Sequence, residues 1–350
     1  MTGLYSLAGL LLRMLDPETA HGLTIRALKL GLAPHIPVPA SRVLQTSVFG
    51  LNFPNPVGIA AGFDKNAEVP DAMLRLGFGF AEAGTVTPLP QAGNPRPRIF
   101  RLAEDQAVIN RLGFNNQGLD IYRARLAARR ARPGIVGANI GANKDSANRI
   151  ADYLICFEAL AGLADYFTIN VSSPNTPGLR GLQDRELLQD LLAQLLTARA
   201  RRQTNVPLLL KIAPDLDEQA LRDVVAVALE AGIDGLIISN TTIGSRENLQ
   251  SRHRMEQGGL SGRPLFAPST RMLRDAWRLS DGKLPLIGVG GVASGADAYA
   301  KIRAGASLVQ LYTAMTFAGP DLAAKIVIEL GGLLEKDGFA NVREAVGMDV

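Results

Sequence analysis

Short hydrophobic runs alternate with amphipathic segments from about residue 57 to the C-terminal region of the chain. Each run is four to six residues long and rich in Val, Ile, Leu and Phe, as in strands that are buried on both faces of a parallel sheet. The runs predict strands at residues 57–60, 80–85, 135–140, 166–171, 208–212, 236–239, 286–289 and 308–311. Helical spacing of apolar residues predicts helices near residues 66–77, 117–130, 148–164, 184–203, 217–232, 266–280, 294–305 and 320–335.

The order of these elements favours a single barrel domain over residues 41–350. Eight strands, each followed by a helix, within about 300 residues are the arrangement of a (β/α)8 barrel, or TIM barrel. A doubly wound sheet is the alternative, but the turn after the first strand lacks the Gly-x-Gly-x-x-Gly pattern of that fold. The barrel also requires functional groups to gather where the strands end, because active sites of this fold lie at that rim.

Residues 1–40 carry a different pattern, that of two short leucine-rich helices followed by a proline-containing linker. The first helix runs from Leu4 to Leu15, and the second begins at the capping residue Asp16 and ends near Gly31. Neither has the roughly 20 apolar residues of a membrane span, and the leucines lack the preceding basic residues of a signal peptide. The pattern leaves three roles open for this hairpin: packing against the barrel, a dimer contact, or lying in a membrane interface.

Composition argues against several classes of function. The 350 residues are 47% hydrophobic and carry a net charge of only +4, so the chain can form a large core and is a poor candidate for binding nucleic acid. The densest basic run, residues 123–132, falls on a predicted helix and is interpreted as its solvated face. A single cysteine, Cys156, excludes an intramolecular disulfide, and three scattered histidines have no metal-ligand spacing. We therefore expect no structural metal.

The loop Asn170-Val-Ser-Ser-Pro-Asn-Thr-Pro-Gly178 directly follows the fourth barrel strand and is rich in hydroxyls and amides. Its two prolines restrict the backbone of the loop, and Gly178 at its end allows the backbone to move. Taken alone, it is either an ordinary surface turn or a lid with a catalytic group at its base. The other strand ends favour a lid at an active site, because they also carry lysines, amides, hydroxyls or glycines: residues 61–66, Thr85, Asn139, Lys211, Ser239 to Thr241, Gly290 with Gly291, and Tyr312 with Thr313.

The ends of strands seven and eight predict a phosphate site. Gly290-Gly291 and Tyr312-Thr313 offer backbone N–H groups at the place where barrels commonly hold a phosphate. Lys65 and Lys211 end apolar strands, where a lysine acts either as a Schiff-base amine or as a cation that stabilises an anion. The second role is favoured by the many amides, which suit a planar heterocycle with carbonyl and N–H edges. These amides are Asn110, Asn115, Asn139, Asn170, Asn175 and Asn240.

Six motifs carry a family resemblance that covers nearly the whole chain. They are Ala61-Gly-Phe-Asp-Lys-Asn66, Gly93-Asn-Pro-Arg-Pro-Arg98, Asn110-Arg-Leu-Gly-Phe-Asn-Asn116, Asn170-Val-Ser-Ser-Pro-Asn-Thr176, Ser261-Gly-Arg-Pro-Leu265 and Val289-Gly-Gly-Val292. In this order they resemble the motifs of dihydroorotate dehydrogenase, in its quinone-dependent, membrane-associated class. The resemblance implies an FMN-binding (β/α)8 barrel that oxidises dihydroorotate to orotate in pyrimidine biosynthesis and passes the electrons to a membrane quinone.

The resemblance also implies residue roles. Ser173, where the family's soluble class has cysteine, would be the base that removes the C5 proton, and Lys65 would meet the developing negative charge. The implied substrate-binding residues are Lys65, Asn110, Arg111, Leu112, Gly113, Phe114, Asn170, Asn175, Asn240 and Thr241. The implied FMN-binding residues are Ala61, Gly62, Lys65, Thr85, Asn139, Asn170, Lys211, Ser239, Gly262, Gly290, Gly291, Tyr312 and Thr313.

The hairpin gains a role from the same resemblance, because a quinone tail needs an apolar tunnel from the bilayer to the flavin. His21, Arg101 and Tyr312 are implied at the quinone head. We therefore expect a monomeric, peripheral membrane protein at the cytoplasmic face of a bacterial inner membrane. Two alternatives remain to be tested: a Schiff-base aldolase and a membrane-associated module that only binds a phosphate ligand.

Overall fold

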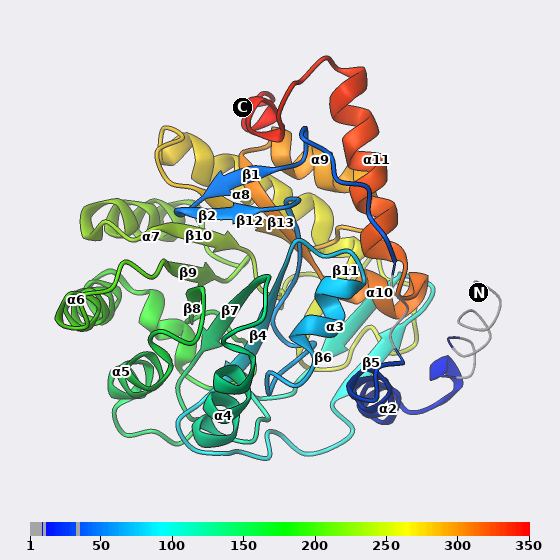
Figure 1. The fold of residues 1–350 in the computed structure, drawn as a ribbon. Coiled ribbons are helices and arrows are strands. Elements are labelled where there is room, and N and C mark those ends of the chain that lie inside the picture. Colours follow the sequence, from blue (N-terminus) through cyan, green and yellow to red (C-terminus); the bar gives the residue numbers. More distant parts are fainter. Residues whose placement is uncertain (1–8, 10–11, 33–35) are drawn as a thin grey trace.

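The computed structural model describes residues 9, 12–32 and 36–350, and its centre is a closed barrel of eight parallel strands (Figure 1). Around the barrel the strands follow the order β10-β12-β13-β3-β4-β7-β8-β9. Their bounds are β3 (Val57–Ile59), β4 (Phe80–Val86), β7 (Ile135–Ile140), β8 (Tyr166–Asn170), β9 (Leu208–Ile212), β10 (Gly235–Ile238), β12 (Leu286–Val289) and β13 (Ala306–Leu311). The predicted TIM barrel is confirmed, with each strand within two residues of its predicted bounds.

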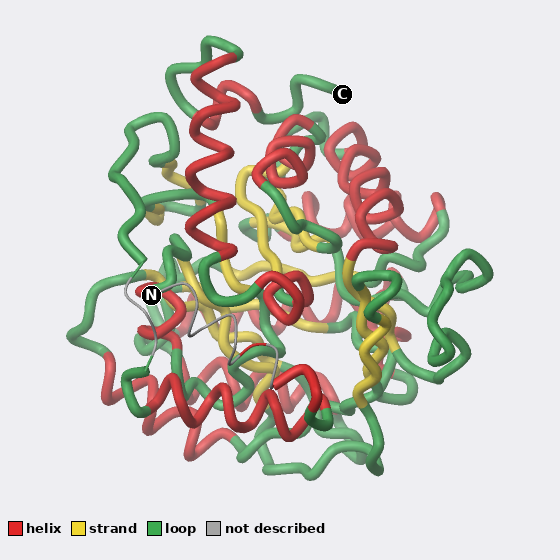
Figure 2. Tube along the Cα trace, turned by 90° about the vertical axis from the view of Figure 1, so that its right-hand side faces the viewer, coloured by secondary structure: helices red, strands yellow, loops and turns green. Residues whose placement is uncertain are grey.

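Helices surround the barrel, as Figure 2 shows from a second direction. They are α3 (Pro70–Arg75), α4 (Leu119–Arg129), α5 (Arg149–Leu160), α6 (Arg185–Arg201), α7 (Glu218–Ala231), α8 (Phe266–Leu279), α9 (Gly295–Arg303) and α11 (Leu322–Lys336). Three of them begin where the side chain of Asn148, Asp217 or Ser294 accepts a hydrogen bond from a first-turn N–H. Helix α3 is shorter than predicted because Asp64 accepts from the N–H groups of residues 66, 68 and 69 and holds them in a turn.

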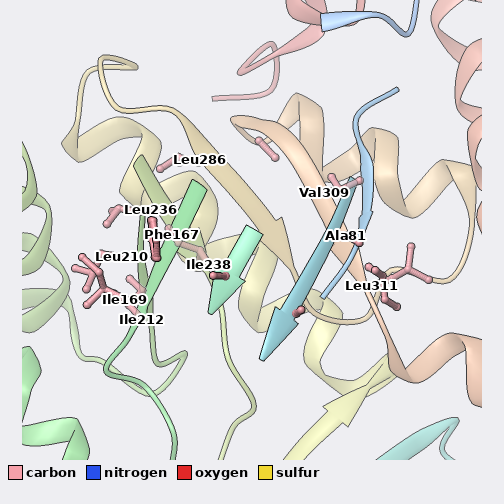
Figure 3. Close-up of a cluster of buried hydrophobic side chains, with 14 of the residues drawn as sticks. Ala81, Phe167, Ile169, Leu210, Ile212, Leu236, Ile238, Leu286, Val309 and Leu311 are labelled. Atoms are coloured by element: carbon pink, nitrogen blue, oxygen red, sulfur yellow. The ribbon is translucent and has the colours of Figure 1, made fainter. Parts of the chain in front are cut away.

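Alternate strand residues pack on opposite sides of the barrel wall. Outward residues such as Ile169, Leu210 and Val309 pack against the helices in the main core, part of which Figure 3 shows. The inward residues form a second cluster, which fills the barrel: Ala60, Phe80, Tyr166, Leu209, Ile237, Ile287, Val289 and Leu308. The barrel is therefore a packed core, and a ligand has room only beyond the strand ends.

Several short elements were not predicted from the sequence. A hairpin of β1 (Thr46–Val48) and β2 (Leu51–Phe53) closes the N-terminal end of the barrel, where Phe53 packs edge-on against Phe80 with ring centroids 5.2 Å apart. A three-stranded sheet of β5 (Ile99–Leu102), β6 (Ala107–Asn110) and β11 (Gly259–Gly262) contacts the short helix α10 (Thr313–Ala318). These elements are too short for hydrophobic periodicity to mark them.

The second predicted N-terminal helix is α2 (Pro17–Lys29), which packs beside β5. Asp16 caps it by accepting hydrogen bonds from the N–H groups of Glu18 and Thr19, as predicted. Of the first predicted helix, residues 9 and 12–14 are helical and Leu15 lies in a bend, and its other residues lie outside the described part of the chain. In the described ranges, no helix is long and apolar enough to cross a membrane.

One sequence interpretation was partly wrong. Arg129, within the basic run on α4, is buried rather than solvated, and its guanidinium contacts Asp71 at 3.1 Å. Arg123 and Arg130 are exposed as expected. Cys156 is buried among apolar residues, and burial raises the pKa of its thiol well above the usual value, so it is an unreactive core residue.

Candidate active site

A cavity of about 1990 Å³ extends from the C-terminal ends of the barrel strands to α2. At the barrel end its wall is polar and includes Lys65, Asn170, Ser173 and Lys211. Toward α2, α10 and α11 the wall is largely apolar: Leu12, Leu15, Ala20, Leu23, Ala27, Leu28, Met315, Phe317, Ala324 and Ile328. A polar chamber and an apolar passage are thus parts of one continuous space.

Nearly every site residue implied by the sequence motifs lines this cavity. The predicted residues that do not line it are Asn115, Asn139, which is buried behind the wall, and Arg111, whose guanidinium turns away to pair with Glu256 at 2.9 Å and to stack 4.6 Å from the ring centroid of Phe100. Arg111 therefore stabilises the sheet in which β6 pairs with β11. The side chain of Arg111 does not reach the cavity.

Asn170 is at the centre of a directional network of hydrogen bonds. Its Nδ2 donates to Thr85 Oγ1 over 3.0 Å and to Asn139 Oδ1 over 3.2 Å. Its Oδ1 accepts from Ser172 Oγ over 2.8 Å and from Asn240 Nδ2 over 3.4 Å, and the same Nδ2 of Asn240 donates to Ser172 Oγ over 2.9 Å. Each amide is thereby held with its donor and acceptor ends in fixed directions.

The network ends at Glu82, a carboxylate inside the barrel that the motifs did not indicate. Glu82 accepts hydrogen bonds from Asn139 Nδ2 at 2.8 Å, Gln310 Nε2 at 2.8 Å and Tyr166 Oη at 3.1 Å. Because all three partners donate, Asn139 must direct its carbonyl oxygen toward Thr85 and Asn170. An acidic residue within an otherwise apolar strand, at position 82, is the sequence signal that could have identified it.

Ser173 lies at the base of the loop that follows β8 and is 5% exposed, in the cavity wall. Its Oγ accepts a hydrogen bond from Asn175 N over 3.3 Å, while Asn175 Nδ2 reaches Asn110 Oδ1 over 3.2 Å. Arg180 links this loop to the segment that follows β10, because it donates to the carbonyl oxygens of Ser172 at 3.1 Å and Thr241 at 3.2 Å. Sequence reasoning missed Arg180, and it gave no role to Ser172.

Two lysines bring positive charge to the polar chamber. Burial lowers the pKa of Lys65 to about 8, and its Nζ donates to Gly62 O over 2.8 Å. Burial also lowers the pKa of Lys211, whereas the charge of Glu82 acts in the opposite direction. Within the described part of the chain the Nζ of Lys211 has no hydrogen-bond partner, so it is free to bind a group in the cavity.

Bare backbone N–H groups line the cavity after β12. Among the described residues, those of Gly290, Gly291 and Val292 have no hydrogen-bond acceptor. A Cβ on Gly291 would lie 2.6 Å from the backbone N of Phe266, so only glycine allows the turn to pack so closely against α8. Unpaired N–H groups in a glycine turn make a site for an anion such as a phosphate.

Three aromatic rings that line the cavity, those of His21, Phe63 and Tyr312, pack against one another. Phe63 packs edge-on against both His21 and Tyr312, at centroid distances of 5.4 and 5.6 Å. Burial, together with the charge of Lys65, lowers the pKa of His21 to about 3, so its imidazole is neutral at physiological pH. Arg101 donates to the carbonyl oxygens of Arg13 at 2.8 Å and Leu15 at 2.9 Å, which fixes the chain before α2.

Comparison with known proteins identifies the family. A family model described as dihydroorotate dehydrogenase matches residues 43–334. The chain belongs to the dihydroorotate dehydrogenase family.

Within this family the chain is similar to members named for the quinone-dependent enzyme. It is 62% identical to the dihydroorotate dehydrogenase (quinone) of Parvibaculum lavamentivorans and 54% identical to that of Xanthobacter autotrophicus, in both cases over 99% of each chain. Among solved structures it is similar to DHODH from Eimeria tenella in complex with ferulenol. That match has a TM-score of 0.92 and 43% identity, and it covers 95% of this chain and 96% of the other.

These comparisons confirm the family resemblance, including its quinone-dependent class, and the assignment of the chain as an enzyme of that class. The individual residue roles stay predictions, as does the division at residue 40. In the ranges that the structure describes, no group of three or more His, Cys, Asp or Glu residues is arranged to hold a metal ion.

Proposed function

We propose that the chain oxidises dihydroorotate to orotate, with FMN as the hydride acceptor and a membrane quinone as the final electron acceptor, in pyrimidine biosynthesis. The observation that carries this proposal is the single cavity that joins an amide-lined chamber to an apolar passage. The chamber offers hydrogen bonds and charge to a polar heterocycle, and the passage suits a hydrophobic tail. Both redox partners therefore have access to one cofactor.

Three features of the chain fit FMN. The unpaired N–H groups of Gly290 and Gly291 suit its phosphate, and Lys211, whose Nζ has no hydrogen-bond partner among the described residues, suits an electron-rich edge of its ring. Gly262 has a φ of 96°, and a Cβ there would lie 2.4 Å from the carbonyl oxygen of Gln106, so this wall requires glycine. When bound, FMN would take the hydride from the substrate and pass electrons singly or in pairs to the quinone.

Ser173 would accept the C5 proton of dihydroorotate. An alkanol is a weak base at neutral pH, so its action depends on nearby positive charge and on exclusion of water. Lys65 would supply that charge and bind the substrate carboxylate, while the backbone N–H of Asn175 holds the serine oxygen in place. Asn110, Asn170, Asn175, Asn240 and Thr241 would orient the ring through its carbonyl and N–H groups.

The passage beneath α2 would hold the quinone, with its head near His21, Arg101 and Tyr312. A neutral His21 suits an uncharged quinone better than an imidazolium does. Large apolar side chains of the N-terminal segment are exposed, among them Met14 and Leu30, at 79% and 78%. Such residues support a peripheral attachment to a membrane through the N-terminal hairpin. We propose in addition that the protein is a monomer at the cytoplasmic face.

The proposal is tested by steady-state assays with purified protein and dihydroorotate. Orotate formation is followed by absorbance with a long-tailed quinone, fumarate or NAD as the acceptor. We expect sustained turnover with the quinone and far slower turnover with the other two. Faster turnover with fumarate or NAD would overturn the assignment of the electron acceptor, and absence of orotate with all three would overturn the substrate.

A further inference from the structure

Lys301 is a buried lysine to which the proposed chemistry gives no role. Its side chain, on α9, is 0% exposed. The Nζ atom donates to Ser269 Oγ over 2.9 Å and to Thr270 Oγ1 over 3.0 Å, and lies 5.2 Å from the ring centroid of Phe266. No carboxylate in the described ranges lies within ion-pair distance of it. A buried ammonium without a counter-charge is strongly disfavoured, so this arrangement requires an explanation.

The neighbours of Lys301 connect it to the glycine turn after β12. Ser269 Oγ, which accepts from Lys301, has two carbonyl acceptors for its own proton, the oxygens of Gly290 and Phe266, each at 3.2 Å. Because Thr270 Oγ1 already donates to Phe266 O over 2.7 Å, Gly290 O is the acceptor left without another side-chain donor. Since an ammonium only donates, Lys301 directs the hydroxyl proton of Ser269 toward a carbonyl acceptor. The Gly290 carbonyl is thereby held toward α8, while the N–H groups of Gly290 and Gly291 remain unpaired beside the cavity.

We propose that Lys301 is a positioning residue for the phosphate end of the cofactor: it holds the Gly290–Gly291 turn through Ser269 and places a buried positive charge behind it. This inference rests on the proposed binding of FMN. The missing counter-charge of Lys301 is then the phosphate itself. The lysine distinguishes a phosphorylated flavin from one that lacks the phosphate, because the isoalloxazine ring and ribityl chain carry no comparable charge.

Few other charges act on Lys301. The strands β12 and β13 contain no charged residue. Asp297, one turn earlier on α9, is the carboxylate whose charge opposes the effect of burial on the pKa of Lys301. The remaining charged groups on α9 and on the elements packed against it are Arg271, Arg274, Asp275, Arg278, Arg303, Lys325, Glu329, Glu335, Lys336, Arg343 and Glu344. Glu329 is already engaged by the N–H groups of Gly295 at 2.7 Å and Ala296 at 3.3 Å.

The same geometry gives flavin selection a pH dependence. Burial lowers the pKa of Lys301 to about 7. With riboflavin bound, the lysine therefore loses its proton above about pH 7, whereas a bound phosphate keeps it protonated. Replacement of riboflavin by FMN then takes up a proton, and the preference for FMN falls as the pH rises, by up to about tenfold per pH unit.

The test is flavin exchange on the holoenzyme, followed by the ratio of bound FMN to bound riboflavin at equilibrium. Lys301→Met keeps the length and apolar stem of the side chain, and the hydroxyls of Ser269 and Thr270 keep carbonyl acceptors. We expect Lys301→Met to lower the preference for FMN at pH 6.5 at least tenfold and to remove its pH dependence. Lys283→Met, at a lysine that is 70% exposed, is the matched control and should change neither.

Several outcomes would overturn the proposal: an unchanged preference in Lys301→Met, equal weakening of both flavins, or a wild-type preference that is constant between pH 6.5 and 9. The wild-type measurement decides the matter even if the variant does not fold. A purified protein that binds no flavin would instead contradict the proposed function, so the two failures are distinguishable.

Discussion

Glu18 of α2 and Arg98, which directly precedes β5, form a two-point ion pair, with Nη2 to Oε1 at 2.6 Å and Nε to Oε2 at 3.0 Å. The side chain of Arg98 is only 6% exposed, so the pair is largely shielded from water. Arg98 also donates to the carbonyl oxygens of Ala92 and Asn94, and Asn94 in turn binds the carbonyl oxygen of Asn175 in the active-site loop. The N-terminal helix is thus docked onto residues that support the substrate chamber.

The first prediction concerns this docking. Glu18→Gln removes the charge while Arg98 keeps its carbonyl partners, and a charge-assisted hydrogen bond contributes about 1.5–3 kcal/mol. We expect the apparent KM for a long-tailed quinone to rise roughly tenfold, with little change in the rate of reduction by dihydroorotate. Arg96→Gln, which removes an exposed partner of the same carboxylate, is the control and should have a small effect. Equal loss in both half-reactions would mean that α2 supports the whole fold.

The second prediction is a pH dependence of orotate binding. The pKa of Lys65 in the free enzyme is about 8, and an anionic ligand favours the protonated lysine. The dissociation constant for orotate should therefore rise with pH above 8, approaching tenfold per pH unit by pH 9. Spectral titration of the bound flavin measures it, and in Lys65→Met the constant should be high and independent of pH. A wild-type constant that stays flat up to pH 9 would remove Lys65 from the carboxylate site.

The third prediction separates the two serines of the loop. Ser173→Ala should slow flavin reduction by ~10²–10⁴-fold with FMN still bound, which is the usual contribution of a positioned base. Ser172→Ala removes the hydroxyl that donates to Asn170 and accepts from Asn240, so it should weaken orotate binding and leave reduction at saturating substrate within tenfold. Rapid-mixing absorbance under anaerobic conditions distinguishes the two. Comparable reduction rates in both variants would contradict the role of Ser173.

The fourth prediction is an effect of His21 on stability in acid. The folded-state pKa of His21 is about 3, against an ordinary value of 6.5. Between these values the unfolded chain binds a proton that the folded chain excludes, so stability falls as the pH drops from 6.5 toward 3. His21→Phe should reduce the stability lost between pH 6.5 and 5 by about 1–2 kcal/mol, as measured by urea unfolding. An unchanged loss would mean that the imidazole is protonated or solvated in the native protein.

The sequence was sufficient to predict the barrel because its strands are buried on both faces and its helices have one apolar stripe. The bounds of β7, β9 and β12 were predicted without error for this reason. The β1–β2 hairpin was missed, since three-residue strands are too short to display a period, although its turn has positive φ at Phe49 and Gly50. Arg129 was wrongly assigned to the solvated face of its helix, because its salt bridge to Asp71, which is distant in the sequence, allows the charged side chain to be buried.

The candidate site was predictable where chemistry follows a barrel strand directly, as at Lys211 or Ser173. It was not predictable where a residue acts through another. Glu82 orients Asn139 from inside the barrel, and Lys301 reaches the glycine turn through Ser269 on a different helix. Such residues are joined only by the folded geometry, so no local motif contains both partners.

The most direct test of the proposed function is the absorbance spectrum of the purified protein under anaerobic conditions, before and after one equivalent of dihydroorotate and then of a long-tailed quinone. We expect a flavin spectrum that is bleached by dihydroorotate, with release of orotate, and restored by the quinone. A colourless protein that borohydride traps with its substrate, or a flavin that dihydroorotate leaves unchanged, would contradict it.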